Sequence, residues 1–79
     1  MKQYKTDWEI IKEIAVLRTG QNGWTKELNY ISWNGQKPKF DVRWWSPDKK
    51  YVGKGLTLTQ DEIALLEKVI ATLPQQLEV

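Results

Sequence analysis

The chain of 79 residues contains no cysteine and no histidine. Without cysteine it can form neither a disulfide framework nor a thiolate metal site, a composition that fits a reducing compartment. Without histidine the usual ligand sets for zinc, copper and non-haem iron cannot be assembled, and the commonest general base is missing. We therefore expect a protein that is not an enzyme and that holds no metal and no other cofactor.

Long apolar runs are also lacking. No stretch approaches the roughly 20 apolar residues that cross a bilayer, and residues 1–10 lack the apolar centre of a secretory signal. The sequence therefore predicts a cytoplasmic protein, with or without association with the nucleoid, that has neither a membrane partner nor a small-molecule substrate.

The chain is short enough to form one domain with a small core. At this size a second subunit often supplies the apolar burial that one chain cannot provide. We expect residues 1–79 to form a single domain that dimerises, with residues 1–7 and 74–79 as frayed tails.

Charge is unevenly distributed, although the formal net charge is only +2. Residues 1–33 carry five cations and four anions, residues 34–58 carry six and two, and residues 59–79 carry one and four. The middle of the chain is therefore the basic part, where an anionic partner is expected.

Residues 8–19, WEIIKEIAVLRT, fit either a strand or a helix by their apolar spacing. The β-branched residues and the turn-forming GQNG that follows favour a strand. Asn22-Gly23 predicts a two-residue type I′ hairpin, because both residues tolerate positive φ. Counting outward from this turn places Leu17 opposite Leu28 and Arg18 opposite Glu27, together with Ala15 opposite Tyr30 and Ile14 opposite Ile31.

Residues 26–45 read as two further strands around a loop that contains Asn34-Gly35 and is bounded by Pro38. A loop of three or five residues aligns Tyr30 with Phe40, whereas an even-numbered loop does not, so the odd length is preferred. The register then divides the side chains between two faces. The expected core face holds Leu28, Tyr30, Phe40, Val42 and Trp44, and the candidate binding face holds Asn29, Ile31, Trp33, Lys39, Asp41, Arg43 and Trp45.

Residues 46–55 read as a turn, and a fourth strand follows from Leu56, with Leu56 and Leu58 toward the core. Thr59 and Glu62 form a capping box for a helix that should end at Leu73, before Pro74. The apolar arc of this helix is wider than one small sheet needs, which suggests a partner helix. The expected dimer interface comprises Leu65, Leu66, Val69, Ile70 and Leu73.

Aromatic and cationic residues alternate in the basic part, a pattern that suits the flat bases and charged backbone of a single-stranded nucleic acid. Trp33 and Trp45 are expected to be exposed on the binding face, Trp8 and Trp44 to be core, and Trp24 to be either. Arg18, Glu27 and Arg43 are expected to form a cross-strand ladder or a simple salt-bridged surface. The candidate nucleic-acid-binding residues are Trp24, Lys26, Trp33, Lys37, Lys39, Arg43, Trp45, Lys50 and Lys54.

Several motifs in this order resemble one known family. They are Asp41-Val42-Arg43 followed by aromatics, the Pro47-Asp48 turn, residues 54–58 (KGLTL) running into a capped helix, and residues 23–29 (GWTKELN). The chain resembles the positive cofactor four type of single-stranded DNA-binding transcriptional coactivator, and in particular its bacterial YdbC-like branch.

The resemblance implies an α+β fold, in which a strongly curved four-stranded antiparallel sheet is followed by one helix and two chains pair through their helices. It also implies that the sheets grip single-stranded DNA, with contacts at Arg43, Trp45 and Lys54. The leading hypothesis is a largely sequence-independent single-stranded DNA-binding homodimer acting in transcription regulation, replication or repair. A single-stranded RNA-binding protein and a protein-protein interaction module that uses its tryptophans are the alternatives.

Overall fold

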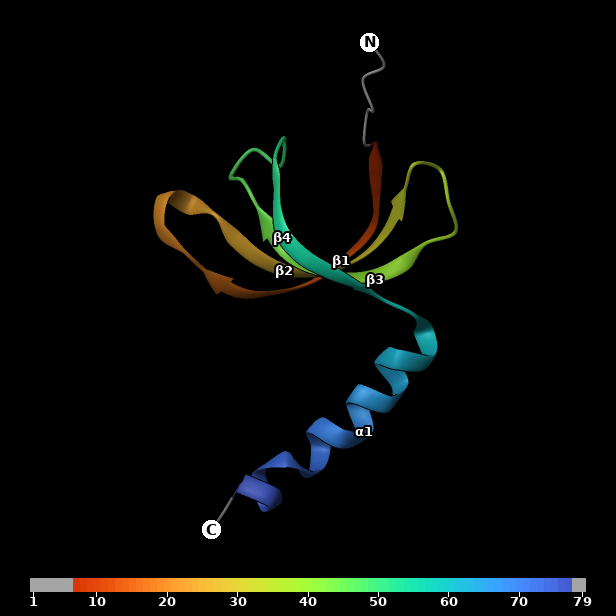
Figure 1. The fold of residues 1–79 in the computed structure, drawn as a ribbon. Coiled ribbons are helices and arrows are strands. Elements are labelled where there is room, and N and C mark those ends of the chain that lie inside the picture. Colours follow the sequence, from red (N-terminus) through yellow and green to blue (C-terminus); the bar gives the residue numbers. More distant parts are fainter. Residues whose placement is uncertain (1–6, 78–79) are drawn as a thin grey trace.

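The structure is a computed structural model that describes residues 7–77, the side chains of residues 75 and 76 excepted. Four strands form one antiparallel sheet in the order β1-β2-β3-β4, and one helix follows them (Figure 1). This confirms the predicted α+β class and the order of its elements. The elements are β1 (Trp8–Thr19), β2 (Thr25–Trp33), β3 (Lys39–Trp45), β4 (Val52–Leu58) and α1 (Gln60–Leu77), with a short 3-10 turn, η1 (Gln21–Gly23), between β1 and β2.

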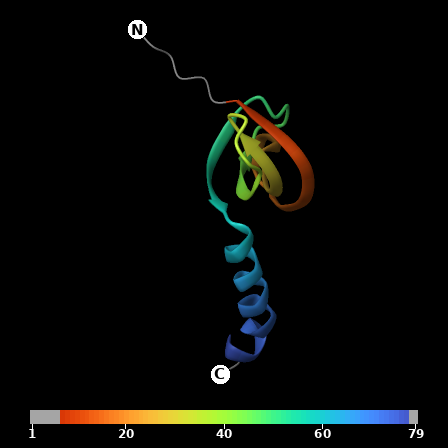
Figure 2. The ribbon, with the colours of Figure 1, turned by 90° about the vertical axis from the view of Figure 1, so that its right-hand side faces the viewer.

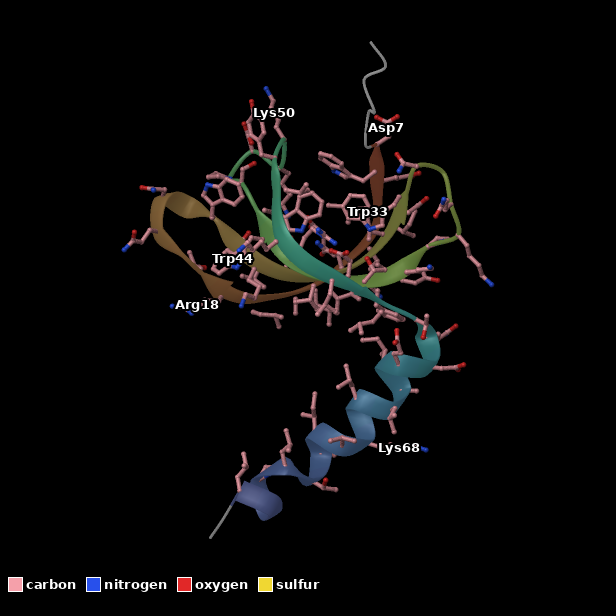
Figure 3. The ribbon with its side chains drawn as sticks, viewed as in Figure 1. Asp7, Arg18, Trp33, Trp44, Lys50 and Lys68 are labelled. Carbon is pink, nitrogen blue, oxygen red and sulfur yellow. The ribbon has the colours of Figure 1, made fainter. Side chains whose placement is uncertain are left out.

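The sheet is strongly curved, so that its two faces differ (Figure 1). We call the concave side the inner face; Trp33 lies inside the curve (Figure 3). Because side chains alternate along a strand, the inner face also receives Glu27, Asn29, Ile31, Asp41, Arg43 and Trp45, whereas the outer face receives Leu28, Tyr30, Phe40, Val42 and Trp44.

The register between β2 and β3 is the one predicted. Leu28 lies opposite Val42 and Tyr30 opposite Phe40, and five residues, 34–38, separate the strands. Asn34 and Gly35 both have positive φ, 52° and 71°, so they make the turn that their residue types indicate.

Between β1 and β2 the predicted register is wrong, although both strands form. Leu28 lies opposite Ala15, not Leu17, and Glu27 lies opposite Val16, not Arg18. The loop is longer than two residues: the Gly20 N–H donates to the Trp24 carbonyl at 2.7 Å. Asn22 and Gly23 do have the expected positive φ, 60° and 78°.

Irregularities along β1 explain most of the error. The pairing shifts between Ile10 and Lys12, between Glu13 and Ala15, and between Val16 and Arg18. At each shift β1 contains one more residue than its partner strand, which is the geometry of a β-bulge and bends the strand. This bending fits the way β1 follows the curved sheet (Figure 2).

Strand β4 begins earlier than predicted, at Val52, so that residues 52–55 belong to the sheet and not to the turn. Gly55 lies opposite Arg43, and Leu56 and Leu58 lie opposite Val42 and Phe40. The two leucines therefore lie on the outer face with Val42 and Phe40, as predicted.

The capping box of α1 is confirmed. The Thr59 N–H donates to Glu62 Oε1 at 2.8 Å, and the Glu62 N–H donates to Thr59 Oγ1 at 3.2 Å. The predicted end at Leu73 is wrong, because the helix runs through Pro74 to Leu77. Proline removes one N–H from the hydrogen-bond ladder, and residues beyond it still complete a last turn. Of the expected tails, residues 1–6 and 78–79 lie outside the described residues.

The helix extends away from the sheet and does not cover its outer face in the single chain (Figures 1 and 2). Leu65, Ile70 and Leu56 are 63%, 55% and 54% exposed. Among the described residues, the fully buried apolar side chains are those of Ile31 and Trp45, both at 0% exposure. The hydrophobic core of the single chain thus lies on the inner face, which corrects the expectation that the opposite face would be the core.

Candidate nucleic-acid interface

Three tryptophans meet on the inner face. Trp8 packs edge-on against Trp33 and Trp45, with 6.0 Å and 5.6 Å between ring centroids, and Trp33 stacks on Trp45 at 6.5 Å. Trp45 is fully buried, so the prediction that its indole is exposed for a base is wrong; the curvature of the sheet and Trp8 enclose it. Trp33 is half-buried and retains an accessible part.

Arg43 covers the ring of Trp33, with its Cζ 4.8 Å from the ring centroid. Its guanidinium forms two hydrogen bonds to the carboxylate of Asp41, Nε to Oδ1 at 2.8 Å and Nη2 to Oδ2 at 2.9 Å. Asp41 is fully buried, so this pair belongs to the floor of the inner face.

The expected ladder of Arg18, Glu27 and Arg43 does not form. Glu27 and Arg43 are neighbours across the strands, but Arg43 binds Asp41. Arg18 lies opposite Lys26 because the loop between β1 and β2 is longer than predicted. Glu27 instead pairs with Lys49, whose Nζ is 2.7 Å from Glu27 Oε1.

Glu27 and Lys49 form a largely enclosed polar group. Glu27 is 3% exposed, and it also accepts hydrogen bonds from Thr25 Oγ1 at 2.5 Å and Asn29 Nδ2 at 3.1 Å. Burial alone would raise the pKa of the Glu27 carboxyl, but the hydrogen bonds from Lys49, Thr25 and Asn29 outweigh it and the pKa is lowered.

The same Nζ of Lys49 also pairs with Glu13, with 3.0 Å between Nζ and Oε1. Burial favours the neutral amine, yet hydrogen bonds to Glu27 and Glu13 outweigh this effect, and the pKa of Lys49 is raised. Arg43 and Lys49 are therefore already paired with carboxylates.

Two of the candidate lysines lie beside the outer face. Lys26 pairs with Trp44 across the strands, and its Nζ lies 5.2 Å from the centroid of that ring. Lys26 and Lys54 both line a hollow of about 310 Å³, together with Trp44 and Leu56. Trp44, expected to be core, is half-buried here.

The remaining candidates lie in turns or at strand ends. Trp24, in the first turn, is half-buried, and its ring lies near Gly53. Lys37, Lys39 and Lys50 are exposed, and Lys50 projects from the rim of the sheet (Figure 3). In the part of the chain that the structure describes, no carboxylate lies within ion-pair distance of Lys26, Lys37, Lys39, Lys50 or Lys54.

Sequence reasoning did not identify the roles of Lys49 and Trp8. Lys49 adopts φ of 61°, and its position after Pro47-Asp48 could have indicated a tight turn, though not its partner. Asp48 itself serves the turn: it accepts hydrogen bonds from Ser46 Oγ and from the Lys50 N–H.

Residues 7–77 contain no cluster of acidic residues suited to a metal ion. No helix of this range is long and apolar enough to cross a membrane.

The fold is an α+β domain in which one amphipathic helix follows a curved antiparallel sheet. The sheet and its turns carry tryptophans and lysines, and within residues 7–77 the five candidate lysines lie outside ion-pair distance of any carboxylate. Residues 21–69 match the family described as Transcriptional Coactivator p15 (PC4), and the chain belongs to this family. It is a non-enzymatic family with a single-stranded-DNA-binding fold. An uncharacterized protein of Treponema pallidum (strain Nichols) is 46% identical over 66 residues, which cover 84% of this chain and 78% of that protein.

Proposed function

We propose that this chain is a largely sequence-independent single-stranded DNA-binding protein that acts as a homodimer in transcription regulation, replication or repair. The observation that carries the proposal is the membership of the PC4 family. The lysines that have no carboxylate within ion-pair distance among the described residues support it, and two of them, Lys26 and Lys54, lie beside the half-buried Trp44.

Bases stack on the accessible parts of Trp33 and Trp24, each contributing about 1–3 kcal/mol. Trp45 supports Trp33 from within the sheet and does not itself meet the ligand. The lysines contact phosphates. Single strands are preferred because paired bases hide their faces. The proposed phosphate contacts are Lys26, Lys37, Lys39, Lys50 and Lys54.

A second copy of the chain covers the exposed apolar side of α1. Leu65, Val69 and Ile70 are 63%, 43% and 55% exposed, and leaving so many apolar groups in water is unfavourable. The proposed interface comprises Leu65, Leu66, Val69, Ile70 and Leu73.

The proposal is tested by titrating the tryptophan fluorescence of the protein with oligothymidine at two salt concentrations, with duplex DNA as the control. We expect quenching by the single strand and weaker binding at higher salt, with a log-log slope of about −0.7 for each phosphate neutralised. Salt-insensitive titrations, or tighter binding to the duplex, would contradict the proposal. A matched RNA oligomer distinguishes single-stranded DNA from RNA as the preferred ligand.

A further inference from the structure

Asp41 is completely buried, and both of its oxygens are used. Oδ1 accepts a hydrogen bond from Arg43 Nε at 2.8 Å; Oδ2 accepts from Arg43 Nη2 at 2.9 Å and from Thr57 Oγ1 at 3.1 Å. The fork of the guanidinium thus meets the carboxylate edge to edge, the geometry in which arginine orientation is best defined.

Two further contacts fix the plane of the guanidinium. Arg43 Nη1 donates to the Gly53 carbonyl at 3.3 Å, and Cζ lies 4.8 Å from the centroid of the Trp33 ring. Of the five N–H groups of the guanidinium, three are therefore engaged by the protein. The Arg43 side chain is only 17% exposed.

The carboxylate of Asp41 offsets the positive charge of Arg43. A phosphate that approached the guanidinium would also approach the Asp41 carboxylate, and the repulsion by the anion would cancel much of the attraction by the cation. Lys39 lies on the same strand, exposed and without a carboxylate partner within the described residues. Phosphate neutralisation therefore falls to Lys39 in preference to Arg43.

A hollow of about 410 Å³ lies beside Arg43. Trp33, Asn34, Arg43, Val52 and Thr57 line it. A planar nucleobase fits a space of this size, and bases stack on guanidinium planes as well as on aromatic rings.

We propose that Asp41 is a positioning residue that holds Arg43 as a flat stacking surface for one nucleobase in this hollow, and that Arg43 does not neutralise a phosphate. This inference rests on the proposed binding of single-stranded DNA and specifies how one position of that surface works. In this arrangement the contribution of Arg43 to the binding free energy depends on the presence of a base and not on the salt concentration.

The test compares binding of oligothymidine with binding of an abasic deoxyribose-phosphate strand of equal length, at several salt concentrations. We expect the double substitution Arg43→Gln with Asp41→Asn, which removes both charges and leaves no unpaired buried carboxylate, to weaken binding to oligothymidine about tenfold. It should leave both the salt slope and the abasic affinity unchanged. The control Lys39→Ala should weaken binding to both strands and reduce the slope by about 0.7.

Asp41→Asn tests the positioning role, because the amide keeps the shape of the side chain and removes its charge. We expect weaker binding to oligothymidine with a salt slope steeper by about 0.7, since the guanidinium charge is no longer offset. Thr57→Val is the milder variant if Asp41→Asn fails to fold. It removes one hydrogen bond to Asp41 and should weaken oligothymidine binding without affecting the abasic strand.

A fall of the slope in the double variant equal to that in Lys39→Ala would overturn the inference and leave the proposed function intact. An equal loss on both strands in the double variant or in Thr57→Val would also overturn it. Failure of the unmodified protein to bind either strand would instead refute the proposed function.

Discussion

Lys49 extends from the turn between β3 and β4 to Glu27 on β2, where 2.7 Å separates Nζ from Oε1. The contact joins a turn to the first half of a strand, 22 residues away in the sequence. Because Glu27 is 3% exposed, its charge depends on this partner and on its neighbours Thr25 and Asn29. The pair therefore joins the turn to β2, and the contact of Lys49 with Glu13 joins it to β1 as well.

Replacing Lys49 with methionine should lower the free energy of unfolding by about 1–3 kcal/mol, because a buried carboxylate loses its charged donor. Urea unfolding followed by tryptophan fluorescence measures the change. The adjacent Lys50 is exposed, and Lys50→Met should alter stability by less than about 0.5 kcal/mol. Equal effects of the two substitutions would show that the pair does not stabilise the fold.

The pH dependence of stability follows from Glu27. Because its pKa is lowered in the folded state relative to an ordinary value of 4.5, the folded state binds fewer protons than the unfolded state as the pH falls through this range. The stabilisation is complete above pH 4.5 and is lost as the pH falls through the folded pKa. Urea unfolding at a series of pH values between 3 and 7 should show this loss, and Glu27→Gln should reduce it.

Gly55 should tolerate no side chain. A Cβ there would overlap Arg43 and the Val42 carbonyl, and these are backbone and near-backbone atoms that cannot move aside. We expect Gly55→Ala to cost about 3 kcal/mol in thermal or urea unfolding. Gly35, where nothing lies within 4 Å of an added Cβ, has φ of 71°, and Gly35→Ala should cost only about 1–2 kcal/mol. The reverse order would contradict the close approach of β3 and β4.

Local chemistry made several features predictable. The pairing of Tyr30 with Phe40 follows from side-chain alternation and the odd loop length, and the box of Thr59 and Glu62 follows from the spacing of two residue types. The bulges of β1 have no comparable signature, because an extra residue requires no particular side chain. Counting from Asn22-Gly23 therefore accumulated errors along the strand.

Side-chain alternation also could not predict which face of the sheet would be buried. Both faces carry aromatic residues, and only the curvature of the sheet distinguishes them. It encloses Trp45 and Asp41, both at 0% exposure, and leaves Leu56 in solvent in the single chain. The partner of Lys49 is a long-range contact, which no local pattern specifies.

The exposed apolar side of α1 gives a last prediction, which concerns assembly. If a second copy covers Ile70, which is 55% exposed in the single chain, then Ile70→Asp should convert a dimer into a monomer, because the dimer would bury an unpaired carboxylate. The neighbouring Ala71 lies toward the polar side of the helix by its 100° spacing, so Ala71→Asp adds the same charge and should leave the dimer intact. Sedimentation equilibrium at micromolar concentrations measures both variants. A monomeric unmodified protein, or dissociation by both substitutions alike, would contradict pairing through this face of the helix.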